Sequence, residues 1–232
     1  MENKGNVVAV YDNFDTANMA VKALVAEGFS RDDIGLAANN ATGAYNNLAA
    51  DQVVDTSEDV SGGEGGGFGA VVGGITGAVV ALSAIVIPGI GPIIAAGPLV
   101  ALLGGATGAV VGGAAGAVTG GIAASLMHLG IPEEDAQHYV ESVRRGNALV
   151  TVAVTNDDDA TTASNVLQRY NPVDIKNRAE QWREGGWKGF DPNAAPYTQE
   201  DLVKESQSYP ADRVVTKEDD SIRRFPPVPP LT

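Results

Sequence analysis

The sequence VVAVY at residues 7–11 predicts a β-strand, because it is a short apolar run rich in β-branched residues. An amphipathic helix is predicted next, from Asp15 to Glu27, with its alanine, valine and leucine side chains on one face. A second strand is predicted from Ile34 to Ala38. Together these elements predict one βαβ unit at the start of the chain.

A second unit of the same kind is predicted in the last third of the chain. A helix is predicted from Pro132 to Arg145, with proline near its start and acidic residues in its first turn. It is followed by a predicted strand from Leu149 to Val154, a helix from Ala160 to Tyr170 and a short closing strand from Val173 to Ile175.

The two units share local sequence. Gly5-Asn6 precedes the first strand as Gly146-Asn147 precedes the later one, and each unit ends in Asp-Ile, at residues 33–34 and 174–175. We interpret this as a diverged internal repeat, with chance similarity as the alternative. Two βαβ halves in one small sheet predict an α+β fold, a ferredoxin-like sandwich interrupted by a long Gly/Ala-rich helical hairpin and followed by an extended tail.

Five segments are therefore expected. They are the first βαβ half (1–38), a flexible Gly-rich linker (39–67), a glycine-zipper helical hairpin (68–127), a helix plus the second βαβ half (128–176), and an aromatic and Pro-rich tail (177–232).

Composition narrows the classes of function. The net charge of −14 and the pI of about 4.4 oppose binding to nucleic acid, which requires clustered lysine and arginine. The absence of cysteine excludes disulfides, thiolate metal sites and cysteine nucleophiles. The first residues have no basic and apolar signal pattern, so we expect a cytoplasmic location.

The hairpin segment has no ionisable side chain between Glu64 and His128. A helix over Phe68–Ile87 would be about 30 Å long, which matches a bilayer core, and one over Leu99–Met127 would be about 43 Å long. The turn between these two arms is predicted at the prolines of the segment, namely Pro88, Pro92 and Pro98.

Glycine recurs every fourth residue in both arms. The rows are Gly69, Gly73 and Gly77 in the first arm, and Gly104, Gly108, Gly112, Gly116 and Gly120 in the second. Small residues at this spacing let helix backbones approach closely, so these rows are predicted to mediate helix packing and oligomerisation. Each glycine costs about 0.8–1 kcal/mol of helix propensity relative to alanine, so packing must offset that cost.

Several environments could supply this packing. They are a bilayer, a lipid surface penetrated by the hairpin, and a soluble homo-oligomer. The alternative without a specific function is that the segment is a poorly ordered linker. Absence of charge favours lipid, whereas the lack of lysine and arginine beside the segment argues against it. We therefore expect a cytoplasmic domain that associates with membrane lipid and with itself, with a soluble filament-like or shell-like assembly as the alternative.

Other candidate sites have structural explanations. The acidic runs at 133–135 and 157–159 fall at predicted helix starts, where they cap amides. The histidines His128 and His138 lack metal-ligand spacing, so neither a metal nor a cofactor is expected. With no nucleophile, base and orienting group suggested, we predict that the protein is not an enzyme.

The tail contains large aromatic residues, which predict that the tail docks onto the sheet. The alternative is that these residues form a patch that binds a ligand. They are Trp182, Trp187, Phe190 and Phe225. The proline-rich end FPPVPP at residues 225–230 predicts either a peptide that binds a protein partner or a disordered end.

The order of these elements resembles a known family. The strand at residues 7–11, the helix closing on Gly28-Phe29-Ser30-Arg31-Asp32-Asp33-Ile34, the Gly/Ala hairpin and then Leu129-Gly130-Ile131-Pro132-Glu133-Glu134 are similar to bacterial general stress proteins of the heat-induced type, and to low-temperature-induced proteins. The resemblance covers residues 6–175 and includes no catalytic residues. It implies a stress-linked, non-enzymatic, structural protein.

Overall fold

A six-stranded antiparallel sheet forms the centre of the computed structural model, which describes residues 5–46, 82–100, 122–209 and 221–227. The strands lie in the order β3-β4-β2-β5-β1-β6. Their bounds are β1 Gly5–Tyr11, β2 Ile34–Asn39, β3 Ser83–Ile87, β4 Gly91–Ala96, β5 Ala148–Val154 and β6 Ile222–Phe225. The helices are α1 Phe14–Ala26, α4 Ile122–His128, α5 Glu133–Arg144, α6 Asp157–Gln168, α7 Ile175–Glu184 and α8 Gln199–Ser208, with a 3-10 turn at Arg31–Asp33. The predicted α+β class is confirmed.

Strand β1 is buried along its whole length. It pairs with β5 in a continuous antiparallel register that runs from Gly5 opposite Val154 to Tyr11 opposite Ala148, and on its other edge with β6. Because alternate side chains of a strand point to opposite faces, a strand buried at every residue must be covered on both faces.

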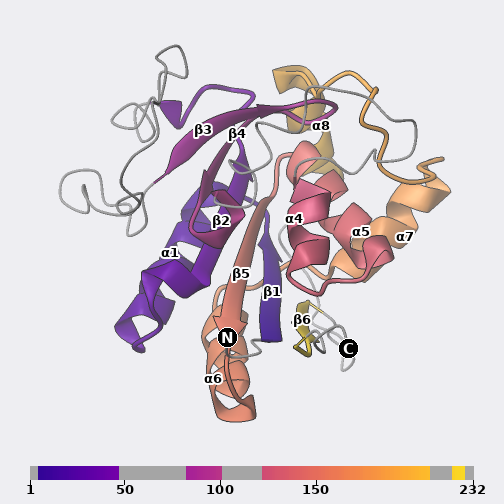
Figure 1. Ribbon diagram of the computed structural model, residues 1–232. Helices are drawn as coiled ribbons and strands as arrows, with labels where there is room; N and C mark the ends of the chain where they lie inside the picture. Colours follow the sequence, from indigo (N-terminus) through magenta and orange to yellow (C-terminus); the bar gives the residue numbers. More distant parts are fainter. Residues whose placement is uncertain (1–4, 47–81, 101–121, 210–220, 228–232) are drawn as a thin grey trace, which may run out of the picture.

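Helices cover both faces of the sheet, as Figure 1 shows, with α1 and α6 on one side and α4, α5 and α7 on the other. Val7, Ala9 and Tyr11 point into the α1/α6 layer, whereas Val8 and Val10 point into the α5/α7 layer. The run VVAVY therefore contributes to two hydrophobic layers at once.

The predicted helices that flank the strands are confirmed, and asparagine side chains cap two of them, α1 and α6. Asn13 accepts a hydrogen bond from the Thr16 amide at the start of α1, and Asn156 accepts one from the Asp159 amide at the start of α6. The Asp159 carboxylate in turn accepts from the Asn156 side chain at 2.8 Å. The acidic runs at 133–135 and 157–159 therefore lie in the first turns of α5 and α6, as predicted, but they do not cap the helix amides: Asn156 caps α6, and α5 has no side-chain cap.

The predicted closing strand at Val173–Ile175 is wrong. Val173 donates one backbone hydrogen bond to Val10, but Asp174 then accepts from the Asn177 amide and caps α7, which begins at Ile175. The second edge of β1 is filled instead by β6, from far downstream in the tail predicted to be extended.

The predicted helical hairpin is wrong over the residues around its turn. Ser83–Ile87, the end of the predicted first arm, is strand β3, and it pairs with β4 to extend the sheet beyond β2. β-Branched residues at 85–87 followed by Pro88-Gly89 favour a strand and a tight turn over a helix end. Of the predicted turn prolines, Pro88 lies in this turn, Pro92 lies within β4 opposite Val86, and Pro98 begins a short helical stretch.

The second predicted arm is helical at 98–100 and in α4, and the remainder lies outside the described residues. So do all eight glycines of the packing rows, namely Gly69, Gly73, Gly77, Gly104, Gly108, Gly112, Gly116 and Gly120, and the predicted linker beyond residue 46. Over the described ranges, no helix combines the length and the apolar character needed to cross a bilayer.

The docking of strand β6 should contribute measurably to the stability of the domain. The Phe225 side chain is 5% exposed and meets the Tyr139 ring edge to face, with 6.4 Å between centroids. We expect Phe225→Ala to lower the free energy of unfolding by about 3 kcal/mol, measured by urea denaturation, because it empties a buried aromatic site. Val203→Ala, at a half-exposed position of α8, should change it by less than about 0.5 kcal/mol. Equal, small effects of the two substitutions would show that the tail does not dock.

Candidate functional site

The two edges of the sheet differ in chemistry. At one edge, β6 has only four residues and includes Arg223 and Arg224, and prolines follow it. Arg224 donates to the Ser164 hydroxyl at 2.9 Å, and Arg223 forms an ion pair with Asp135 at 3.2 Å. Short length, charge and proline are the features that protect a sheet edge from pairing with another chain.

Strand β3 at the opposite edge is also short, with five residues, and is followed by Pro88, but it lacks the charged side chains that β6 has. Its sequence is SAIVI, without charge, and the strand pairings of the described residues join it to β4 alone. Ile85 packs against the α5/α7 layer, whereas Ala84 and Val86 face away from it and are exposed. Val86 has 77% of its surface exposed and lies opposite the exposed Pro92 of β4. An uncharged edge strand with an exposed valine is a surface suited to association.

The turn of this hairpin rests on the tail. Gly89 in the turn has a φ of +77°, and a Cβ atom there would lie 2.7 Å from Cα of Pro192. A Cβ on Gly91 would likewise lie 3.0 Å from the Pro196 ring. Both glycines are therefore needed for the close approach of the hairpin to residues 191–196, which fixes the direction of β3.

An arginine-centred cluster attaches the tail to α5. The Arg145 guanidinium donates to the buried Glu141 at 2.6 Å and to Glu205 of α8 at 3.0 Å. Trp182 donates its indole N–H to the same Glu205 at 3.1 Å. The guanidinium also lies over the Trp182 ring, 4.7 Å from its centroid. Burial lowers the pKa of Arg145, but Glu141 and Glu205 outweigh it and the net pKa is raised, so this cation is permanent.

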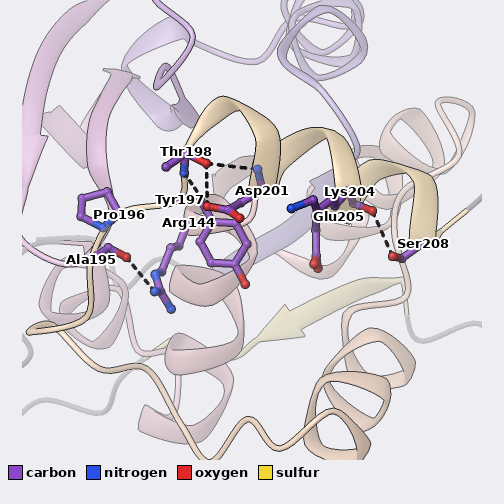
Figure 2. A pocket seen from close by; sticks show the side chains of 9 residues that line it. All are labelled: Arg144, Ala195, Pro196, Tyr197, Thr198, Asp201, Lys204, Glu205 and Ser208. Atoms are coloured by element: carbon purple, nitrogen blue, oxygen red, sulfur yellow. Dashed lines mark hydrogen bonds between the residues drawn. The ribbon is translucent and has the colours of Figure 1, made fainter.

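A shallow depression beside this cluster is shown in Figure 2. Arg144 donates to the Ala195 carbonyl at 2.9 Å, and Thr198 and Asp201 form a reciprocal capping box at the start of α8. Hydrogen bonds from Thr198 hold the pKa of Asp201 below its usual value. Thr198 and Asp201 there cap α8, and Arg144 holds the tail through the Ala195 carbonyl, so these groups stabilise the attachment of the tail.

The predicted aromatic residues all lie on the α5/α7 side of the sheet. Trp182 is buried, and Trp187 lies edge to face with it at 5.7 Å, while Phe190 packs at the margin of the same layer. Phe225 joins this layer from β6. The pairing of Arg145 with Glu205 could not be predicted, because residues sixty positions apart give no spacing signal.

The two histidines are not brought together. His128 is exposed at the end of α4, whereas His138 is 5% exposed on α5 between Trp187 and Arg183. Burial, and then the charge of Arg183, lowers the pKa of His138. In the part of the chain that the structure describes, no three or more His, Asp or Glu residues cluster in a way that could hold a metal ion.

Comparison with known proteins adds no relative. No family model matches the chain, and neither a curated protein nor a solved structure is significantly similar to it.

The lowered pKa of His138 should make the stability of the domain depend on pH. Because its pKa is lowered in the folded state, the unfolded chain binds the proton more readily, and stability is lost as the pH falls below about 6.5. We expect the free energy of unfolding, measured in urea, to fall between about pH 6.5 and 5.5, and His138→Gln to flatten this dependence. His128→Gln is the matched control and should leave the slope as in the wild type. An unchanged slope in His138→Gln would contradict the assignment.

Proposed function

We propose that this chain is a non-enzymatic protein that self-associates through strand β3 and the uncharged segment that contains it. The observation that supports this most strongly is the contrast between the two sheet edges. One edge is closed by a short, arginine-containing strand, and the other presents an apolar strand with Val86 exposed.

The distribution of charge supports the same proposal. The chain has a net charge of −14, so two copies repel each other at most surfaces. Residues 65–127 have no ionisable side chain, and β3 lies inside this segment. Contact through β3 therefore avoids like-charge repulsion where the two copies meet.

We interpret the domain that presents this edge as a ferredoxin-like unit made of β1, α1, β2, β5, α6 and β6. Its four strands lie in the order β2-β5-β1-β6, with both helices on one face. In this proposal the β3–β4 hairpin is added to the edge of the unit that β2 forms. The edge strand on that side of the sheet is therefore β3 instead of β2.

The stress-linked role remains a proposal from the resemblance to bacterial general stress proteins. Association with membrane lipid is the second candidate function, and the uncharged segment favours it. Flotation with phosphatidylcholine vesicles, followed by carbonate extraction, tests it. Protein that floats with the vesicles supports lipid association, and protein that stays at the bottom as a large particle opposes it.

The β3 edge can be tested with one substitution. We expect Val86→Lys to shift the particle size, measured by sedimentation velocity, toward the monomer, because a lysine on an edge strand opposes pairing with another copy. Val203→Lys is the matched control, since Val203 is an exposed valine on α8, and it should sediment as the wild type does. The same particle size for Val86→Lys and the wild type would refute the role of β3.

The glycine rows are tested separately. Gly112 lies outside the described residues, so its role rests on the sequence alone. If the row packs helices between copies, Gly112→Leu should reduce particle size by light scattering, because leucine prevents close approach of two backbones. If Gly112→Leu has the particle size of the wild type and Val86→Lys has a smaller particle size, then copies associate through β3 and not through the glycine rows.

A further inference from the structure

A second pocket, which we call the sheet-end pocket, lies away from β3. It has a volume of about 340 Å³, at the lower end of the range of small-molecule sites. Asp12 just after β1, Asn39 at the end of β2 and Asn147 just before β5 contribute to its wall, and Leu202 and Tyr209 contribute from the tail. The pocket therefore forms only where the sheet and the tail meet.

Asn147, which lines this pocket, has a paired backbone amide and an unpaired side-chain amide nitrogen. Helix α5 ends in a Schellman motif, in which Gly146 has a φ of +102° and the Asn147 amide donates to the Ser142 carbonyl at 3.1 Å. The motif fixes the Asn147 backbone at the pocket wall. The residue is 5% exposed, and its side-chain Nδ2 has no hydrogen-bond partner among the residues that the structure describes. Buried amide donors are nearly always paired, so this Nδ2 is a donor that an acceptor entering the pocket could use.

The charges that face the pocket are already balanced. The buried Arg178 forms an ion pair with Asp12 at 3.3 Å and stacks on the Tyr209 ring at 3.8 Å. Arg145 forms ion pairs with Glu141 and Glu205. An anionic or cationic ligand would have to compete with one of these internal pairs, so the site favours a neutral ligand.

Two tyrosines also contribute to the wall. Tyr45 and Tyr209 line the pocket. Burial raises the pKa of both phenols, and a nearby carboxylate raises it further, from Asp15 in the case of Tyr45 and from Glu205 in the case of Tyr209. Both phenols therefore stay protonated and can donate as well as accept hydrogen bonds. The Asp12 carboxylate, which is 44% exposed, adds acceptor oxygens.

We propose that the sheet-end pocket binds a small neutral polyhydroxylated molecule, of the size of a single sugar ring, with Asn147 Nδ2 donating to one of its hydroxyl oxygens and Asp12 accepting from another. Amide, carboxylate and aromatic groups around a charge-balanced pocket match a ligand whose hydroxyls both donate and accept. This site is independent of the association proposed through β3.

Saturation-transfer NMR on the full-length protein tests the proposal with three ring molecules of similar shape and different charge. The probes are glucose, which is neutral, glucuronate, which is an anion, and glucosamine, which is a cation. We expect transfer to glucose and markedly less to the other two. Asn147→Ala should weaken the affinity for glucose, obtained by titrating the saturation-transfer signal, about fivefold, the effect of losing one neutral hydrogen bond. Asn193→Ala, at an exposed asparagine of the tail, should leave the signal unchanged.

A second variant keeps the test valid if Asn147→Ala unfolds, which circular dichroism would show. Ser206 lines the pocket from the exposed side of α8, so Ser206→Trp should block entry without altering the core and should abolish the glucose signal. No transfer to glucose would overturn the proposal, since a water molecule then satisfies Asn147. Stronger transfer to glucuronate or glucosamine, or equal transfer to all three, would also overturn it.

Discussion

The complete burial of β1 is the constraint on which the rest of the structure depends. A strand with no exposed residue must be covered on both faces and paired on both edges, since its backbone amides and carbonyls have no access to water. Helices from different parts of the chain cover the faces, β5 takes one edge, and the tail returns to fill the other as β6. The tail is therefore part of the domain and not an appendage.

Strand β6 closes one edge of the sheet, and a different element forms the other edge. The β3–β4 hairpin extends the sheet past β2 and ends it with an uncharged strand. The turn of the hairpin rests on residues 191–196, and the neighbouring cluster of Arg145, Glu141 and Glu205 holds α8, which follows them in the tail. The tail thus contributes to both ends of the architecture, because it pairs with β1 through β6 and supports β3 through its loop.

The sequence predicts those elements whose signal is local. Strand β1 and helices α1 and α6 have apolar runs, regular spacing and asparagine caps close together, so they were identified correctly. Strand β3 was predicted as the end of a helix and β4 as part of the turn that follows it, because a long run without charge has no periodicity that distinguishes a buried strand from a buried helix.

The elements and sites with non-local causes were missed. Strand β6 contains two arginines in four residues, and it is a strand only because β1, more than two hundred residues earlier, needs a partner. The contacts of Arg145 with Glu205, and the pocket beside Asn147, likewise join parts of the chain that are far apart in the sequence. Asn147 was noted only as part of a repeat, since its unpaired amide exists only in the folded domain.

The central claim is that β3 is the edge at which copies of the chain meet. Hydrogen exchange of the backbone amides at residues 83–87, followed by mass spectrometry over a series of protein concentrations, tests it most directly. If copies pair through β3, exchange in this segment slows as the concentration rises, while exchange in β6 does not change. Exchange at residues 83–87 that is equally fast at all concentrations at which the protein associates would contradict the account.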